Sequence, residues 1–295
     1  MRGVPWAKSS ALSRQKRNVL PNLGAFCVPS AEFTLSVAEG LRVCLARVAV
    51  LSGFRYSLFM VSPRFASTVV LLRPDKDRRF EVLLTRRPPE MKFLGGYYVF
   101  PGGTVHEADY STAVLARCRG LSKAEAQKIL SRPRGPELAL GHWIAGTREV
   151  FEEVGILLCE SKAGEPVDLS DETTRRRLES KRKAIVTEAL NFGEFLESED
   201  LWCDLSRVVY FFHRVTPEIY SMRFDTRFYL AQLPAHQTAL ARSEEVTHSL
   251  WIQPEEALLQ VYENDFPILP PTTTVLEHLA EIGTWGGLRV KYRLG

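Results

Sequence analysis

Residues 141–158 read GHWIAGTREVFEEVGILL, and this stretch organises the rest of the chain. An α-helix stacks residues three and four apart on one face, so Glu149, Glu152 and Glu153 share a face. Three crowded carboxylates repel by about 0.2–0.5 kcal/mol per pair on an exposed helix. A bound divalent cation would reverse that sign, because Mg²⁺ and Mn²⁺ prefer carboxylate oxygens. Other sides of the helix carry residues that can pack onto a sheet: Trp143, Val150 and Val154.

Gly155 is expected to end this helix, because glycine tolerates the left-handed conformation that a helix stop often needs. Ile156-Leu157-Leu158 then continues as a buried strand or a packed exit. Taken alone, a pair of neighbouring glutamates is also typical of a solvated helix end. The residues around the pair favour a binding site instead.

Residues 148–156, REVFEEVGI, resemble the second half of the signature of the Nudix hydrolases, which reads Arg-Glu-apolar-any-Glu-Glu-any-Gly-apolar. All seven specified positions match. The first half of the signature is a glycine, five residues of any kind and a glutamate; counting from Gly103 gives Asp109, an acid one carbon shorter. Between Asp109 and Arg148 stand 38 residues where the signature has seven, so 31 are inserted. This split box resembles the coenzyme A diphosphatase branch, the peroxisomal type and its bacterial relatives. Asp109 is not assigned as a ligand.

A second motif precedes the box at residues 83–103, LLTRRPPEMKFLGGYYVFPGG. It resembles the coenzyme A motif of Nudix enzymes that cleave CoA, with two departures: Pro88 replaces serine and Lys92 replaces arginine. Lysine keeps the charge but loses the two-pronged guanidinium. The resemblance implies substrate contacts at Arg87, Lys92, Gly96, Phe100, Gly102 and Gly103. A cationic loop also suits the phosphates of CoA electrostatically, although a merely solvated loop would look the same.

The resemblance implies an α/β fold, the Nudix α/β/α sandwich with a mixed central sheet and a helical insertion inside the box. The expected Nudix domain spans residues 63–290, with the insert at about 110–140. Mg²⁺ or Mn²⁺ is the implied cofactor, held by Glu149, Glu152 and Glu153. Glu149 and Glu153 are first choices as metal ligands, and Glu152 is a third ligand or the residue that orients or deprotonates water. Arg148 is expected to pair with a neighbouring carboxylate, which completes the catalytic set of Glu152, Glu149 and Arg148.

The implied reaction is hydrolysis of CoA or an acyl-CoA to 3′,5′-ADP and 4′-phosphopantetheine. One alternative is a Nudix hydrolase of ADP-ribose, NADH or another dinucleotide. A second is an inactive, nucleotide-sensing Nudix module, although such modules usually lose the box carboxylates kept here. A further carboxylate from outside the box is expected at Glu244 or Glu245, in the loop before a late strand.

Composition separates the N-terminal 62 residues from the rest. Residues 1–64 hold nine Lys/Arg and two acids, a net +7, so the remainder carries −4 of the formal +3. The pI therefore indicates no basic face for nucleic acid. Residues 1–62 are interpreted as a disordered or loosely helical arm, as a targeting segment, or as sequence upstream of the true start. The apolar stretch 33–61 is a poor membrane span, because charges interrupt it.

Five cysteines without a CxxC pair suit a reducing compartment and exclude a zinc ribbon. The C-terminus, Tyr292-Arg-Leu-Gly295, is not a Ser-Lys-Leu address. We therefore expect a cytoplasmic protein, with an organelle matrix as the alternative. The expected partner is a small CoA-like nucleotide, with neither nucleic acid nor membrane. The oligomeric state is left open, a homodimer included.

Turn residues and β-branched runs predict the remaining elements. We expect strands at 66–72, 80–85, 97–100, 207–213 and 224–230, and a loop followed by a strand across 243–252. We expect helices at 122–130, 170–190, 192–201, 254–262 and 272–282. His213 is expected to be a packed strand residue rather than a ligand. The Thr272-Thr-Thr274 run is expected to cap the last helix.

Overall fold

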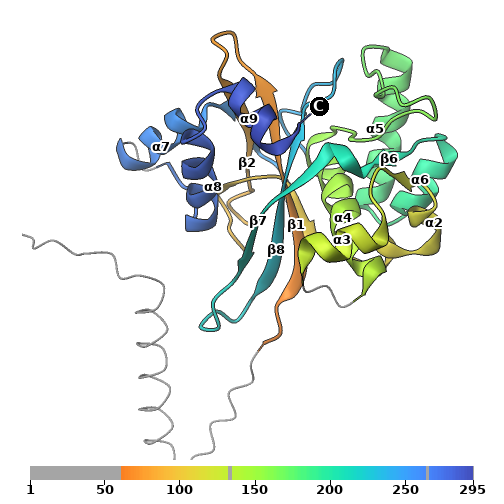
Figure 1. Cartoon of the computed structure of the whole chain (residues 1–295), viewed down its shortest axis with the longest axis horizontal. Helices are drawn as coiled ribbons and strands as arrows, with labels where there is room; N and C mark the ends of the chain where they lie inside the picture. Colours follow the sequence, from red (N-terminus) through yellow and green to blue (C-terminus); the bar gives the residue numbers. More distant parts are fainter. Residues whose placement is uncertain (1–60, 132–134, 264–265, 295) are drawn as a thin grey trace, which may run out of the picture. The chain divides into compact units, whose positions relative to one another are not determined.

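A mixed seven-stranded sheet forms the middle of the domain in this computed structural model, which describes residues 61–131, 135–263 and 266–294 (Figure 1). All but the last two residues of the predicted N-terminal extension, 1–62, lie outside the described residues. The two central strands are parallel, and the others are antiparallel to their neighbours. The longer strands are β1 (Arg64–Pro74), β2 (Phe80–Arg86), β7 (Val208–Val215), β8 (Phe224–Gln232) and β9 (His248–Ile252). All of these strands were predicted, and the mixed sheet is confirmed.

The sheet is split between β1 and β2. These strands pair only at residues 72–74 and 80–82 and then diverge. The gap between them is filled by β3 (Tyr98–Val99), which pairs with β2, and by β4 (Gly102–Thr104), which pairs with β1. Because Thr68 pairs with both Gly102 and Phe228, β4 lies on the β2 side of β1. The motif FPGG therefore crosses the middle of the sheet.

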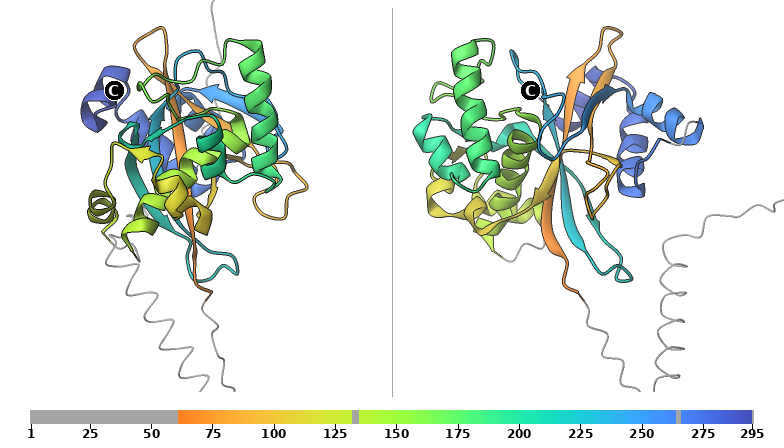
Figure 2. Two further views of the ribbon diagram at one scale, coloured as in Figure 1. Left: turned by 90° about the vertical axis from the view of Figure 1, so that its right-hand side faces the viewer. Right: turned by 180° about the vertical axis from the view of Figure 1, so that it is seen from behind.

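Helices cover both faces of the sheet, and alternate strand residues point into two separate cores (Figures 1 and 2). Val69 and Leu71 of β1 face one group of helices, whereas Val70 and Leu72 face the other. The first group is α2 (Thr112–Leu115), α3 (Lys123–Leu130), α4 (Pro136–Val154), α5 (Glu172–Val186) and α6 (Phe192–Ser198). The second group is α7 (Pro254–Glu263), α8 (Pro270–Ala280) and α9 (Trp285–Tyr292). The α/β/α sandwich is thus confirmed.

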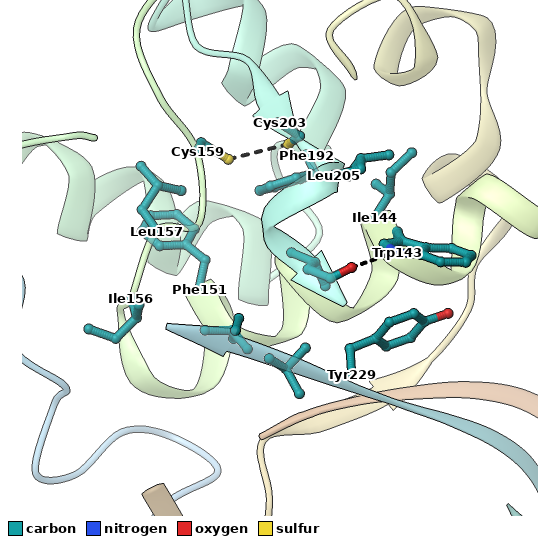
Figure 3. Packing of buried hydrophobic residues seen from close by; sticks show 14 of the residues in the cluster. Trp143, Ile144, Phe151, Ile156, Leu157, Cys159, Phe192, Cys203, Leu205 and Tyr229 are labelled. Atoms are coloured by element: carbon teal, nitrogen blue, oxygen red, sulfur yellow. Dashed lines mark hydrogen bonds between the residues drawn. The ribbon is translucent and has the colours of Figure 1, made fainter. Parts of the chain in front are cut away.

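Helix α4 contains the carboxylate-rich stretch and is longer than the sequence predicts. It begins at Pro136 and ends before Gly155, whose φ of 70° is the left-handed conformation expected of a helix stop. Trp143 lies fully buried on β8, with its ring 4.9 Å from that of Tyr229, and donates a 2.7 Å hydrogen bond to the carbonyl of Val208 (Figure 3). This packing holds α4 against the sheet.

The insert in the box is a helical excursion, as predicted. It contains a short 3₁₀ turn at Glu107–Tyr110, then α2, β5 (Cys118–Arg119) and α3. The Ser122 hydroxyl accepts a hydrogen bond from the Glu125 backbone N–H and so caps α3, while the Glu125 carboxylate accepts one from the Ser122 backbone N–H. Helix α3 packs on α4, and β5 pairs with β6 (Cys203–Asp204). The insert therefore extends the helical layer without disturbing the sheet.

Three local expectations need correction or completion. The cap at Thr272 is wrong: α8 begins at Pro270, with Leu269 before it, because proline suits the first helical position. The exit at residues 156–158 is packed, and Ile156 and Leu157 are fully buried outside any strand. The sequence analysis missed α9, a short helix with two glycines. None of the helices in the described ranges is long and apolar enough to cross a membrane.

Candidate active site

Arg148 is the centre of the candidate site. Its side chain is 7% exposed and contacts three carboxylates. Nε and Nη2 donate to the two oxygens of Asp109 over 2.7 and 3.0 Å, and Nη1 lies 3.0 Å from oxygens of both Glu149 and Glu152. Nη2 also donates to the carbonyl of Thr104. These five contacts match the five N–H donors of a guanidinium, so Arg148 pairs with carboxylates as the sequence analysis expected.

Asp109 is a partner of Arg148 and lies in the core. It is 1% exposed, and besides Arg148 its carboxylate accepts a 2.8 Å hydrogen bond from the backbone of His106. This second bond fixes the 3₁₀ turn at the start of the insert. The Asp109 carboxylate thus holds Arg148 and the start of the insert together.

Gly103 lies directly against Glu149. A Cβ atom built on Gly103 would collide with the carboxylate of Glu149. The contact arises because β4 fills the gap beside β1, under the last turns of α4. Glycine at 103 is therefore required by the close approach of a site carboxylate, a role that the sequence pattern alone does not reveal.

Glu153 is the most deeply buried of the three box glutamates, and two segments from outside the helix act on it. Burial raises the pKa of its carboxyl well above the usual value, and the nearby charge of Glu149 raises it further. Arg87 opposes that shift, Glu245 reinforces it, and a backbone hydrogen bond from Gly102 lowers it. The segment that resembles a coenzyme A motif and the loop before β9 thus converge on Glu153.

The other two box glutamates also have raised pKa values. Burial raises the pKa of Glu149 to about 7, against the lowering effect of Arg148. Burial likewise raises the pKa of Glu152, which is less enclosed. In Arg148 itself, burial works to lower the pKa, but Glu149 and Asp109 outweigh it and the pKa is raised. The guanidinium therefore stays charged, while burial disfavours the anionic forms of Glu149 and Glu152.

The two late glutamates separate in the structure. Glu245 acts on Glu153, whereas Glu244 accepts a 2.9 Å hydrogen bond from Nη2 of Arg182. Arg182 of α5 is buried and also donates to the carbonyl of Glu152 at the end of α4. The sequence analysis predicts a helix at 170–190 and assigns no role to Arg182 within it. In the fold, Arg182 connects α4 to the loop of Glu244 and Glu245, because a cation suits the C-terminal end of a helix.

The donor chemistry of the site suits a divalent cation. Carboxyls outnumber cations there, with Asp109, Glu149, Glu152, Glu153 and Glu245 against Arg87 and Arg148. Buried carboxylates with too little positive charge beside them are stabilised by a bound metal ion. As placed, no three such side chains in the described part of the chain lie close enough to ligate one ion together. Two of the glutamates are turned to Arg148 instead.

The predicted substrate contacts fall into three groups. Arg87 lies near Glu153, and its buried Nε has no hydrogen-bond partner among the described residues. Gly96 is held to Arg87 by a backbone hydrogen bond of 3.1 Å, and Lys92 on the same loop is exposed. Phe100 is buried in the core beneath α7 and α8, where it has no open face toward a ligand.

His213 lies on β7, as predicted. Its Nε2 is 2.7 Å from Oδ1 of Asp225 on the neighbouring strand. His213 is a strand residue as predicted, but the expectation that it is packed is wrong, because it lies at the exposed end of β7 with a side chain that is 39% exposed.

Known proteins resemble this chain over most of its length. A nudix hydrolase of Caenorhabditis elegans, numbered 7, is 25% identical over 75% of this chain and 62% of that protein. The acyl-coenzyme A diphosphatase NUDT19 of Xenopus laevis is 28% identical over 68% of this chain and 60% of that protein. The chain thus spans about three fifths of these relatives. The crystal structure of a NUDIX hydrolase from Alicyclobacillus acidocaldarius superposes with a TM-score of 0.61 at 26% identity, over 77% of this chain and 95% of that one.

The sequence family described as the NUDT19 Nudix domain matches residues 127–279, which is more than half of the chain. That range includes all of α4 and both late glutamates. With the split box, the α/β/α sandwich and the clustered carboxylates, this match leads to one conclusion: the chain belongs to the NUDT19 Nudix domain family of Nudix hydrolases.

Proposed function

We propose that this protein is a divalent-metal-dependent diphosphatase that hydrolyses CoA or an acyl-CoA to 3′,5′-ADP and 4′-phosphopantetheine or its acyl form. The observation that carries the proposal is the meeting of Arg87 and Glu153. Arg87 belongs to the motif that resembles a coenzyme A motif, and Glu153 to the Nudix box. An unpartnered, buried Nε beside a carboxylate site is suited to an anionic oxygen of a diphosphate.

Each site residue has a distinct part in this proposal. Glu149 and Glu153 would hold Mg²⁺ or Mn²⁺, with Glu152 as a third ligand or as the group that orients or deprotonates water. A bound divalent cation neutralises the diphosphate and acidifies water. Arg148 restrains Glu149 and Glu152 through Nη1 and is itself held by Asp109. Arg87 and Lys92 would contact the phosphates of the substrate.

The substrate assay separates this proposal from its rivals. Purified protein is incubated with CoA, octanoyl-CoA, NADH or ADP-ribose and either Mg²⁺ or Mn²⁺, and the products are identified by mass. Metal-dependent release of 3′,5′-ADP from CoA or octanoyl-CoA, above the turnover of the other two, supports the proposal. Faster turnover of NADH or ADP-ribose would assign the protein to the dinucleotide alternative. No turnover of any of the four would favour a nucleotide-sensing module.

A further inference from the structure

A row of three polar side chains closes one end of the sheet beside the candidate site. Arg86 is the last residue of β2, Tyr98 the first of β3 and His248 the first of β9. Arg86 pairs in register with Tyr98 on one side and with His248 on the other. Residues in register across neighbouring strands point to the same face. The three side chains therefore lie together on the face opposite α4.

Contacts between the side chains hold the row in place. The Tyr98 hydroxyl lies 3.1 Å from Nδ1 of His248, and the guanidinium carbon of Arg86 lies 5.7 Å from the centre of the Tyr98 ring. Phe266 stacks on the other side of the tyrosine, with ring centres 4.4 Å apart. Tyr98 is buried, while Arg86 and His248 are exposed. The buried ring of Tyr98 thus positions two exposed nitrogen-bearing side chains, those of Arg86 and His248.

The remaining donors of these groups point to an anion. Nε of Arg86 donates to the carbonyl of Gly96 over 3.1 Å, which leaves both Nη groups without a partner among the described residues. When the Tyr98 hydroxyl donates to Nδ1 of His248, the ring proton lies on Nε2, which becomes an outward donor. Neither side chain is paired with a carboxylate in the described part of the chain. The Nη groups of Arg86 and the Nε2–H of His248, on neighbouring strands, are therefore donors without an acceptor among the described residues, an arrangement that suits an anion.

Both segments that leave this row lead to Glu153. Arg87, which acts on Glu153, follows Arg86 directly, and Glu245, which also acts on Glu153, precedes His248 by three residues. Thr247 ties the segments together through a backbone and a side-chain hydrogen bond to the carbonyl of Arg86, each 3.0 Å or shorter. Strand β2 ends at Arg86, and beyond it Arg87 keeps backbone hydrogen bonds to Tyr97 and Gly96. A ligand held at Glu153 can extend around this end of the sheet.

We propose that Arg86 and His248 form a subsite for a phosphate monoester, which binds the 3′-phosphate of the CoA ribose. The inference rests on the proposed function, because it places the diphosphate at Arg87 and Glu153. A guanidinium with its Nη pair free presents two parallel donors that match two phosphate oxygens. NADH and ADP-ribose have no phosphate monoester on their ribose and would leave the subsite empty. The subsite therefore provides a basis for selecting CoA over these dinucleotides.

The test compares CoA with 3′-dephospho-CoA, which keeps the diphosphate and lacks the monoester. We expect Arg86→Gln and His248→Gln each to lower kcat/KM for CoA roughly 10- to 100-fold, mainly through KM, because a hydrogen bond to a charged group is lost. Turnover of 3′-dephospho-CoA should stay unchanged in both variants. Arg87→Gln should lower turnover of both substrates alike. Arg176→Gln, at an exposed arginine of α5, is the matched control and should change neither.

Equal losses on the two substrates in the Arg86 and His248 variants, or no loss on CoA, would overturn the subsite. Failure of the wild-type protein to hydrolyse either substrate would count against the proposed function instead. A binding measurement decides the subsite in that case. Calorimetry with 3′,5′-ADP and 5′-AMP should show tighter binding of 3′,5′-ADP, and Arg86→Gln should abolish that difference. A difference that persists in the variant, or is absent from the wild type, would refute the assignment.

Discussion

Nε of Arg148 donates to Oδ1 of Asp109 over 2.7 Å, although the two residues are 39 positions apart. This ion pair joins the ends of the insert that splits the box. Both side chains are buried, with exposed fractions of 7% and 1%. The insert can therefore be long without moving Arg148, because its starting point is fixed to the helix that follows it.

Asp109→Asn should destabilise the fold. Removing one partner of a buried ion pair leaves the other charge uncompensated and costs about 3–5 kcal/mol. We expect a loss near the lower end, about 3 kcal/mol, since asparagine keeps the shape of the side chain. Urea denaturation followed by circular dichroism measures it. Asp200→Asn is the control, at a residue that is 73% exposed and paired with Arg117, and should change stability by less than about 0.5 kcal/mol. Equal effects of the two substitutions would contradict a structural role for Asp109.

Glu152→Gln and Glu153→Gln should each abolish metal-dependent hydrolysis while leaving the fold intact. Glutamine keeps the volume of the side chain but removes the negative charge that a cation needs. At Glu153 the substitution also removes the cost of burying an ionisable carboxyl, so stability should not fall. Initial rates at saturating Mg²⁺ or Mn²⁺, with thermal melting curves, provide the measurement. Glu256→Gln, at an exposed position of α7, should behave as wild type. Wild-type turnover in either box variant would remove that glutamate from the site.

Gly103→Ala should lower activity more than stability. The added methyl group meets the Glu149 carboxylate, which can rotate away but then leaves its place in the site. We expect turnover to fall at least about 10-fold, as when the support of a metal ligand is disturbed. Gly286→Ala in α9 is the matched control, because a Cβ there meets nothing within 4 Å. It should keep full activity and leave stability unchanged or up to about 1 kcal/mol higher. Full activity of Gly103→Ala would show that activity does not depend on the position of the Glu149 carboxylate beside Gly103.

His142 should make the protein less stable in mild acid. Burial, and then the charge of Arg227, lower its pKa to about 3, while an unfolded histidine titrates near 6.5. Below pH 6.5 the unfolded chain therefore binds a proton that the folded chain refuses, so this contribution to stability is complete above pH 6.5 and is lost as the pH falls toward 3. Between pH 7 and pH 5 the loss from this residue is about 2 kcal/mol.

Urea denaturation at pH 7 and pH 5 tests this loss. His142→Asn should show a smaller decrease in the free energy of unfolding than wild type, by about 2 kcal/mol. Asparagine retains a polar group toward Ser67, whose hydroxyl lies 3.2 Å from Nδ1 of His142. His236→Asn, at an exposed histidine with φ near 59°, is the control and should keep the wild-type decrease. If the free energy of unfolding of His142→Asn falls between pH 7 and pH 5 as much as that of wild type, groups other than His142 cause the acid sensitivity.

The sequence predicted what depends on neighbours along the chain. The helix around Glu149 follows from spacing, its stop from Gly155, and α3 from the capping box at Ser122. The strands of the sheet were likewise recognised from runs of β-branched and aromatic residues. The error at Thr272 arose because two good helix starts lie next to each other, and proline took the first position. The missed helix α9 has weak helix formers, and packing of Leu288 into the core contributes to its stability.

What the sequence determined by itself is the carboxylate face of α4 and the family of the chain, since both are written in short, contiguous patterns. The tertiary structure alone decided which polar side chains meet: Arg148 with Asp109, Arg87 with Glu153, and Arg86 with His248. These pairs form where β1 and β2 diverge and at the adjoining end of the sheet. Burial of the three glutamates, which raises their pKa values, depends on what covers them, and no local pattern specifies that cover.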